Sequence, residues 1–435
     1  MRIGWTIGLI LSILLFAGSG SAQETKDFFT LEESVKIALE RSLKLHSATE
    51  GILGSEFRRK AARADFFPKW TGQYSYTRYN KPTTIGFFGS DIGGLSRDVH
   101  NLNTSVQQSL FAGGLITSNY RLEKLGVDLS KTNVEVVRRD IVLAVREGYF
   151  NILNSQKLVE VAAQTVKQFK AQLEVTKAFF EVGIVPKNDV LQAEVRLAQA
   201  RQDLIRAENG LALAKSSFNT LLRREINAPL SVADILEYKP FGLRLEECME
   251  EALQKRPEIQ AADLSIGQAK ESVNIARSGY FPTVSLTGGY NRLSEEPGLM
   301  GDYRSERWTV QALATLTLWE WGKTAYKVGE SKVKVTQAED TKRQLIDEIV
   351  LEVKQDYLNM IQAEKNIEVA QKAIEQAEEN LRMNEERYKY QVATATDVLD
   401  AVTLLAQARV NYYGALSDFN IARARLERAM GRMYP

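Results

Sequence analysis

Small and large apolar residues alternate along residues 188–224 at intervals of three and four. The series consists of Val190, Ala193, Leu197, Ala200, Leu204, Ala207, Leu211, Ala214, Phe218 and Leu221. A second series with the same spacing begins 208 residues later, at Val398, and ends at Ala429. A heptad period of this length predicts helices that pack as left-handed coiled coils. Alanine at every second position of the seam allows the paired helices to approach closely.

A longer helical pattern precedes each of these series. The stripe on residues 115–181 consists of Val159, Ala162, Val166, Phe169 and Leu173, and it recurs as Ile367, Ala370, Ile374, Ala377 and Leu381. A helix over 115–181 would be about 100 Å long at about 1.5 Å per residue. The segments 31–66 and 188–224 are each about half as long. We therefore expect two short helices stacked end to end beside one long helix.

Four shorter segments alternate in polarity with a period of two, which predicts β-strands. They are residues 69–79, 103–111, 283–293 and 307–319. In the first, Trp70, Tyr74 and Tyr76 fall on one face, and hydroxyl and amide residues fall on the other. A length of about 10 residues suits a tilted strand in a membrane, and it also suits a soluble sheet. Because membrane barrels need about eight strands or more, several chains would have to contribute strands to one barrel.

The sequence contains two collinear repeats, residues 30–224 (repeat 1) and 244–431 (repeat 2). Near the start of each half, Phe67 matches Phe281 at an offset of 214. Further on, Asp189 matches Asp397 at an offset of 208. The offset changes between the two strands of each half, where loop insertions are tolerated. An irregular linker at 225–243, which contains two prolines, joins the repeats.

The first residues have the features of a secretory signal peptide. Arg2 is followed by an apolar run, and small residues lead to an expected cleavage site after Ala22. The run is too short for a transmembrane helix, which needs about 20 apolar residues. We therefore expect residues 1–22 to be removed on export. A mature chain that enters a membrane is then expected to do so as a β-barrel.

Composition argues against several classes of function. The 56 Lys and Arg residues balance the 55 Asp and Glu residues, so no basic surface for nucleic acid is expected. The single cysteine, Cys248, excludes an internal disulfide and argues against a cysteine-ligated metal. The two histidines, His46 and His100, are expected to be ordinary surface or loop residues. Phosphate-binding loops and common hydrolase motifs are missing from the sequence, so we expect neither an enzyme nor a cofactor.

The duplicated order of elements resembles the TolC family of outer-membrane efflux proteins over nearly the whole mature chain. The motifs that carry the resemblance are Arg256-Pro257-Glu258-Ile259, Phe67-Pro68, Phe281-Pro282, Phe180-Glu181-Val182-Gly183-Ile184, Asp189-Val190-Leu191, Tyr388 and Asp397-Val398-Leu399-Asp400-Ala401. The resemblance implies a mainly α fold with a β-barrel part. Three copies would form a 12-stranded barrel in the outer-membrane lipid, continued by an α-helical tunnel in the periplasm.

The resemblance also implies partners and a function. The turns near 183–187 and 391–395 would lie at the periplasmic end, and the loops near 80–101 and 294–306 would face outside. The homotrimer would act as a passive exit duct, which a periplasmic adaptor protein couples to an inner-membrane pump. The resemblance does not indicate which cargo is exported or which class of pump takes part.

By the same resemblance, four residues would lie at the periplasmic aperture, and five would form the tips that contact the adaptor. The aperture residues are Asp397, Asp400, Tyr388 and Asp189, and the tip residues are Val182, Gly183, Ile184, Val392 and Ala393. Each also has a plainer interpretation: the aspartates can cap helices, Tyr388 lies at a heptad position, and Gly183 suits a tight turn. Ala393 stands where some members carry a gating arginine, so the family's gate salt bridge does not carry over to this position.

Three other functions remain as alternatives. A periplasmic adaptor also carries coiled-coil hairpins, but it has one hairpin and a large β-rich part. A soluble coiled-coil scaffold would leave the four alternating strands unexplained. A periplasmic enzyme would need a catalytic site that the sequence does not offer.

Overall fold

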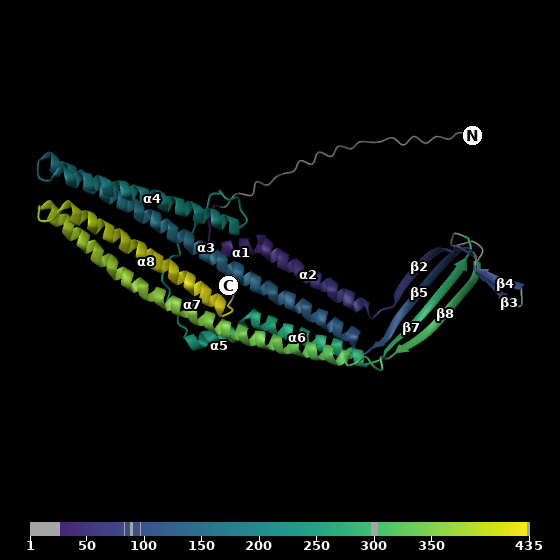
Figure 1. Ribbon diagram of the computed structural model, residues 1–435. Helices are drawn as coiled ribbons and strands as arrows, with labels where there is room; N and C mark the ends of the chain where they lie inside the picture. Colours follow the sequence, from purple (N-terminus) through teal and green to yellow (C-terminus); the bar gives the residue numbers. More distant parts are fainter. Residues whose placement is uncertain (1–26, 82, 88–89, 96, 297–302, 433–435) are drawn as a thin grey trace, which may run out of the picture.

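The computed structural model describes residues 27–81, 83–87, 90–95, 97–296 and 303–432 (Figure 1). The expected signal peptide at 1–22 lies outside these residues. Within them, no helix has a stretch long and apolar enough to cross a membrane. The described chain also contains no cluster of three or more His, Cys, Asp or Glu side chains that could hold a metal ion.

Two helical hairpins of equal size form one end of the molecule (Figure 1). Helix α3 (Leu115–Glu181) and helix α7 (Lys323–Lys389) have 67 residues each. They turn back into α4 (Lys187–Leu221) and α8 (Ala395–Ala429), with 35 residues each. The long helix predicted at 115–181 is confirmed at both ends.

The opening helix of each repeat is broken in two, so the single helix predicted at 31–66 is wrong. Repeat 1 has α1 (Leu31–Arg41) and α2 (Leu43–Ala64), and repeat 2 has α5 (Leu245–Lys255) and α6 (Pro257–Arg277). The residue between each pair is extended, with ψ of 120° at Ser42 and 124° at Arg256. The Ser42 hydroxyl accepts the Leu45 N–H at 3.3 Å and so starts a new helix. In repeat 2, Pro257 occupies the first helical position and ends the preceding helix.

Four antiparallel strands form one sheet in the order β2-β5-β7-β8. They are β2 (Lys69–Arg78), β5 (Asp98–Ala112), β7 (Thr283–Ser294) and β8 (Tyr303–Thr315). All four predicted strands are confirmed, although β8 begins before residue 307 and ends at Thr315. A further hairpin, β3 (Thr83–Phe87) and β4 (Ser90–Leu95), lies within the segment expected to be a loop.

The sheet and the helices form one extended layer (Figure 1), four strands wide in the sheet and four helices wide in the helical part. In the half nearer the sheet the neighbours are α2-α3-α6-α7, and in the other half they are α4-α3-α8-α7. Two short helices therefore stack end to end beside each long one, as predicted. One long edge consists of β2, α2 and α4, and the other consists of β8 and α7.

The middle of the layer carries extra structure on one face. The linker includes β6 (Ser231–Val232), which pairs in parallel with β1 (Phe28–Phe29). The buried Tyr149 hydroxyl of α3 donates to the carbonyl oxygens of Phe29 at 3.2 Å and Ala233 at 2.9 Å. These bonds hold the segment before repeat 1 and the linker after it at the same point on α3.

Candidate functional site

The sheet has one mostly apolar face and one polar face. Directly paired residues lie on the same face, as in the row Trp70, Val106, Gly288 and Val310 and the next row Thr71, Ser105, Gly289 and Thr309. The apolar face includes Trp70, Tyr74, Leu102, Val106, Val284, Leu286, Tyr290, Trp308, Val310 and Ala312. The polar face includes Thr71, Gln73, Ser75, Asn101, Asn103, Ser105, Gln107, Thr287, Asn291, Thr309 and Gln311. The period-two pattern predicted for 69–79 thus extends across all four strands.

Hydrogen bonds connect the polar side chains across the strands. The Thr71 and Ser105 hydroxyls lie 2.9 Å apart, and the Asn291 amide donates to the Asn101 side-chain oxygen at 2.7 Å. On the opposite face the cross-strand hydrogen bonds come from the polar atoms of aromatic side chains, as where the Trp70 indole N–H donates to the Thr104 hydroxyl oxygen at 2.7 Å, and the large rings stay open, with Trp70 80% and Trp308 77% exposed. One side of the sheet therefore suits water, and the other suits an apolar surrounding.

The helical wall has the same division at α8. The linker covers one side of this helix, because the Tyr238 and Phe419 rings lie 5.0 Å apart and the Asn420 amide donates to the Glu237 carbonyl at 3.2 Å. The opposite side carries a polar stripe at intervals of seven and four, consisting of Asp400, Gln407, Asn411, Asp418 and Arg425.

The two hairpin turns have the same backbone shape with different residues. Gly183 has φ of +75° and Gln391, at the matching position, has φ of +61°. Val182 and Val392 are 69% and 65% exposed, Ile184 is also exposed, and Ala393 is partly exposed. The five residues predicted as tips thus lie at the far end of the hairpins, and their apolar side chains have few neighbours.

Tyr388 packs between the hairpins and is only 3% exposed. Its hydroxyl and the Thr176 hydroxyl are 3.2 Å apart, and its ring lies 5.3 Å from the Phe179 ring of α3. Burial raises the pKa of Tyr388, and the charge of Asp189 adds to that effect. Asp189 lies in the first turn of α4 and is partly exposed. Tyr388, near the end of α7, and Asp189, at the start of α4, both lie next to the hairpin turns.

Asp397 caps its own helix. Its carboxylate accepts the Thr394 N–H at 2.8 Å and the Thr394 hydroxyl at 2.8 Å, while its N–H donates to the Thr394 hydroxyl oxygen at 3.3 Å. These bonds form a capping box and lower the pKa of Asp397. The side chain is nevertheless exposed, so the capping role and the predicted place at the aperture are compatible.

Asp400 makes an ion pair that joins the two hairpins. Its carboxylate lies 2.9 Å from the Arg196 guanidinium of α4. One turn nearer the tip, the Thr396 hydroxyl donates to the Gln192 side-chain oxygen at 2.8 Å. Arg196 and Gln192 were not predicted as site residues, because they lie outside the apolar seam and 204 residues from their partners.

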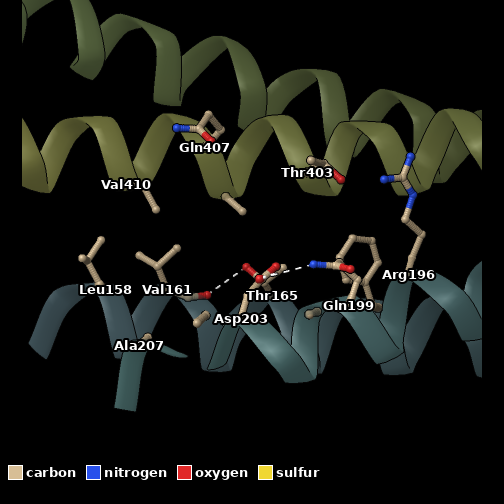
Figure 2. Close-up of a pocket in the computed structure, with 14 residues that line it drawn as sticks. Leu158, Val161, Thr165, Arg196, Gln199, Asp203, Ala207, Thr403, Gln407 and Val410 are labelled. Atoms are coloured by element: carbon tan, nitrogen blue, oxygen red, sulfur yellow. Dashed lines mark hydrogen bonds between the residues drawn. The ribbon is translucent and has the colours of Figure 1, made fainter. Parts of the chain in front are cut away.

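A groove of about 370 Å³ lies between α3, α4 and α8 beside this ion pair (Figure 2). Leu158, Val161 and Val410 give it apolar walls. Polar side chains from all three helices border it, among them Thr165, Gln199, Asp203, Thr403 and Gln407. The groove lies between the two hairpins, farther from their tips than the Asp400–Arg196 pair.

A family model described as outer membrane efflux protein matches residues 35–222 and again 248–432. The chain belongs to this family. Its relatives include the probable efflux pump outer membrane protein TtgC of Pseudomonas putida, which is 23% identical over 95% of this chain and 86% of that protein. Outer membrane protein TolC of Vibrio cholerae is 25% identical over 68% of each chain.

Solved structures share the fold. The CmeC outer membrane channel of Campylobacter jejuni is 19% identical, has a TM-score of 0.80, and is matched over 92% of this chain and 85% of that chain. The outer membrane protein VceC of Vibrio cholerae is 17% identical, has a TM-score of 0.80, and is matched over 93% and 97%. The resemblance to the TolC family is thereby confirmed, and this is a family of efflux proteins rather than enzymes.

Proposed function

We propose that this protein is the outer-membrane channel of a tripartite efflux or secretion system and that three copies form a passive exit duct. The two unpaired edges of the four-stranded sheet carry this proposal. Strands β2 and β8 each present a row of backbone groups that no strand in the described chain pairs with. Because β2 and β8 run in opposite directions, copies can join edge to edge with antiparallel pairing throughout.

Closure of the sheet explains its two faces. Three copies would supply twelve strands, which exceeds the roughly eight that a membrane barrel needs. The apolar face with Trp70, Trp308 and Val310 would then contact outer-membrane lipid, and the hydroxyl and amide face would line a water-filled lumen. Strands of about ten residues have the length expected for this role.

The helices would continue this tube into the periplasm. The linker covers the side of α8 that carries Phe419 and Asn420. If this side faces the outside of the tube, the polar stripe of α8 faces the lumen. Asp400 belongs to that stripe, and Asp397 lies nearby at the helix start. Threefold symmetry would bring three copies of each carboxylate towards one axis, where they would attract cations and repel anions.

The hairpin tips are the proposed contact with the rest of the system. Val182, Ile184 and Val392 offer exposed apolar side chains at the end farthest from the sheet. A periplasmic adaptor that covers them would bury this surface and connect the duct to an inner-membrane pump. The duct itself carries out no energised step in this proposal.

Planar-bilayer recording of the purified protein tests the proposal. A small cation-selective conductance is expected, and Asp397→Ala with Asp400→Ala should reduce its selectivity. Asp340→Ala with Asp347→Ala, two exposed aspartates of α7, is the matched control and should leave selectivity unchanged. Folded protein that never inserts would contradict the channel and favour a scaffold or an adaptor.

A further inference from the structure

The strand pairing between the two repeats of one chain is a guide to the strand pairing between copies. Strands β5 and β7 belong to different repeats, and they pair Phe111 with Val284 and Ala112 with Thr283. The register shifts at Leu110, between the pairs Ser109–Ser285 and Phe111–Val284. This internal junction is the only one in the described sheet that joins the end of one repeat's hairpin to the start of the other's.

The two repeats superpose on one another in register. Lys69 pairs with Gln107 in the first hairpin, and the matching pair in the second hairpin is Thr283 with Thr315. The offsets are 214 for the first strand and 208 for the second, as in the sequence. Transferring the β5–β7 junction by these offsets therefore gives one definite register between β8 and β2 of another copy.

We propose that neighbouring copies join in this register, with Trp319 opposite Trp70 and Glu320 opposite Lys69 of the next copy. The partner is a second copy of this chain, and the inference rests on the proposed ring of copies. The bulge at Leu110 transfers to Leu318. Thr317 then lies opposite Thr71 of the next copy, on the polar face.

A stretch of chain without a partner supports this register. Residues 108–112 pair with β7, whereas the matching residues 316–320 follow the end of β8 and pair with no strand in the described chain. Leu318 is 87% exposed and Trp319 is 74% exposed. Trp70, on the opposite edge, is comparably exposed. Joining the edges would extend β8 and bury the two indoles against each other, as cross-strand aromatic pairs prefer.

The charges on the two edges are complementary. Lys69 is 71% exposed at its side chain and lies 3.3 Å from Asp65 of its own copy. Glu320 accepts the Thr324 N–H at 2.7 Å at the start of α7. In the proposed register the lysine of one copy faces the glutamate of the next. A different register that brought Lys323 of one copy opposite Lys69 of the next would instead place two positive charges together.

The corner after the strand also distinguishes this junction from the internal one. Gly113 has φ of +60°, and a Cβ there would lie 2.6 Å from the Ser278 carbonyl oxygen. Trp321 takes the matching position with φ of +54°, a costly conformation for a bulky residue. The corner between copies must therefore be wider than the internal one. A cavity of about 520 Å³ is lined by Phe67 and Leu115. In the proposed register the cavity of the next copy would lie beside Trp321.

Disulfide cross-linking tests the register in the full-length protein with Cys248→Ala, which removes the single native thiol. Thr71→Cys with Thr317→Cys should give covalent dimers and trimers on denaturing gels after oxidation by copper phenanthroline, because opposed residues bring Cα atoms within about 6 Å. Gln73→Cys with Thr317→Cys lies on the same face but two residues away. It should cross-link at least tenfold more slowly.

Each outcome is decisive. Faster cross-linking of the Thr71 pair supports the register, and faster cross-linking of the Gln73 pair overturns it. Equal failure of both pairs in a protein that still conducts in bilayers overturns the register while the channel stands. A cysteine-free protein that neither conducts nor forms oligomers overturns both.

Discussion

Helices α4 and α8 carry the same heptad series, yet they experience different surroundings. Every member of the α8 series except Tyr412 is buried, because α8 lies between α3 and α7. In α4 the middle of the series, Leu204 to Ala214, is only partly buried, and Val195 and Leu213 on the other side are 68% and 69% exposed. The heptad pattern therefore indicates that a helix packs against a neighbour on one side. It does not indicate whether the opposite side of the helix is also covered. In the proposed ring of copies, the exposed apolar residues of α4 would face α7 of another copy.

The largest expected effect on stability comes from comparing a buried position of α8 with the matching, partly exposed position of α4. Phe419→Ala removes a fully buried ring from α8 and should lower the free energy of unfolding by about 3–5 kcal/mol. Leu211→Ala at the matching position of α4 should cost about 1–2 kcal/mol, because this side chain is partly exposed already. Denaturant midpoints of the two variants in detergent compare them. Equal losses would show that α4 is as enclosed as α8.

A smaller difference concerns Asp356 of α7, which stands where repeat 1 has Gly148. Burial, together with the charge of Glu352, raises the pKa of Asp356 to about 6. A carboxyl whose folded pKa lies above its unfolded value binds a proton first in the folded state, so its contribution to stability grows as pH falls from about 7 to about 5. Discounted for partial exposure, the gain should be about 1–2 kcal/mol.

Asp356→Asn should abolish that part of the pH dependence. Asp347→Asn, an exposed change on the same helix, should retain it. Thermal midpoints recorded across this pH range provide the measurement. If the Asp356→Asn variant had the same pH profile of thermal midpoints as the wild type, the raised pKa of Asp356 would be refuted.

The two tips give a comparison of about 1 kcal/mol in each direction. Gly183→Ala places a Cβ in a left-handed conformation and should destabilise the first tip by about 1–2 kcal/mol. Gln391→Gly should relieve a similar cost at the second tip, partly offset by the entropy of glycine. Hydrogen exchange of the amides next to each turn reports both effects. Opposite signs are expected, and the same sign in both would contradict the backbone argument.

The smallest effect on stability, with the clearest effect on conduction, is expected at Arg196. Its pair with Asp400 is about half exposed, so Arg196→Ala should cost less than about 1 kcal/mol. Because Asp400 would lose its counter-charge, cation selectivity measured from reversal potentials should increase. Arg382→Ala is the matched control, since Arg382 pairs with Glu379 on its own helix. Equal selectivity in both variants would place Asp400 away from the aperture.

The periodic spacing of apolar residues along the sequence predicted the long helix and the strands. The helix at 115–181 and the four strands follow from heptads and from alternation, the stacking of two short helices beside a long one follows from helix lengths, and the resemblance to the family supplied the ring of three copies. The break at Ser42 escaped prediction because serine is tolerated inside helices and caps one only when the preceding residues end there. The β3–β4 hairpin escaped because its residues lack a regular alternation.

The site was predictable only in part. Asp397, Asp400 and Tyr388 were named from motifs, and their position at the aperture remains a prediction. Thr176 and Arg196, the partners of Tyr388 and Asp400, come from the other repeat, as does Gln192, the partner of Thr396. These residues carry no motif, and only the folded chain brings them within hydrogen-bonding distance.

The unbroken length of α3 has a mechanical consequence. From Tyr149, which holds the segment before repeat 1 and the linker after it, α3 continues to Glu181 over about 48 Å at about 1.5 Å per residue. A stiff rod held at that point acts as a lever arm. A rotation of about 5° there would carry the tip by about 4 Å at this length. Small forces at the tip can therefore produce displacements of the size of an ion, without any bend inside the helix itself.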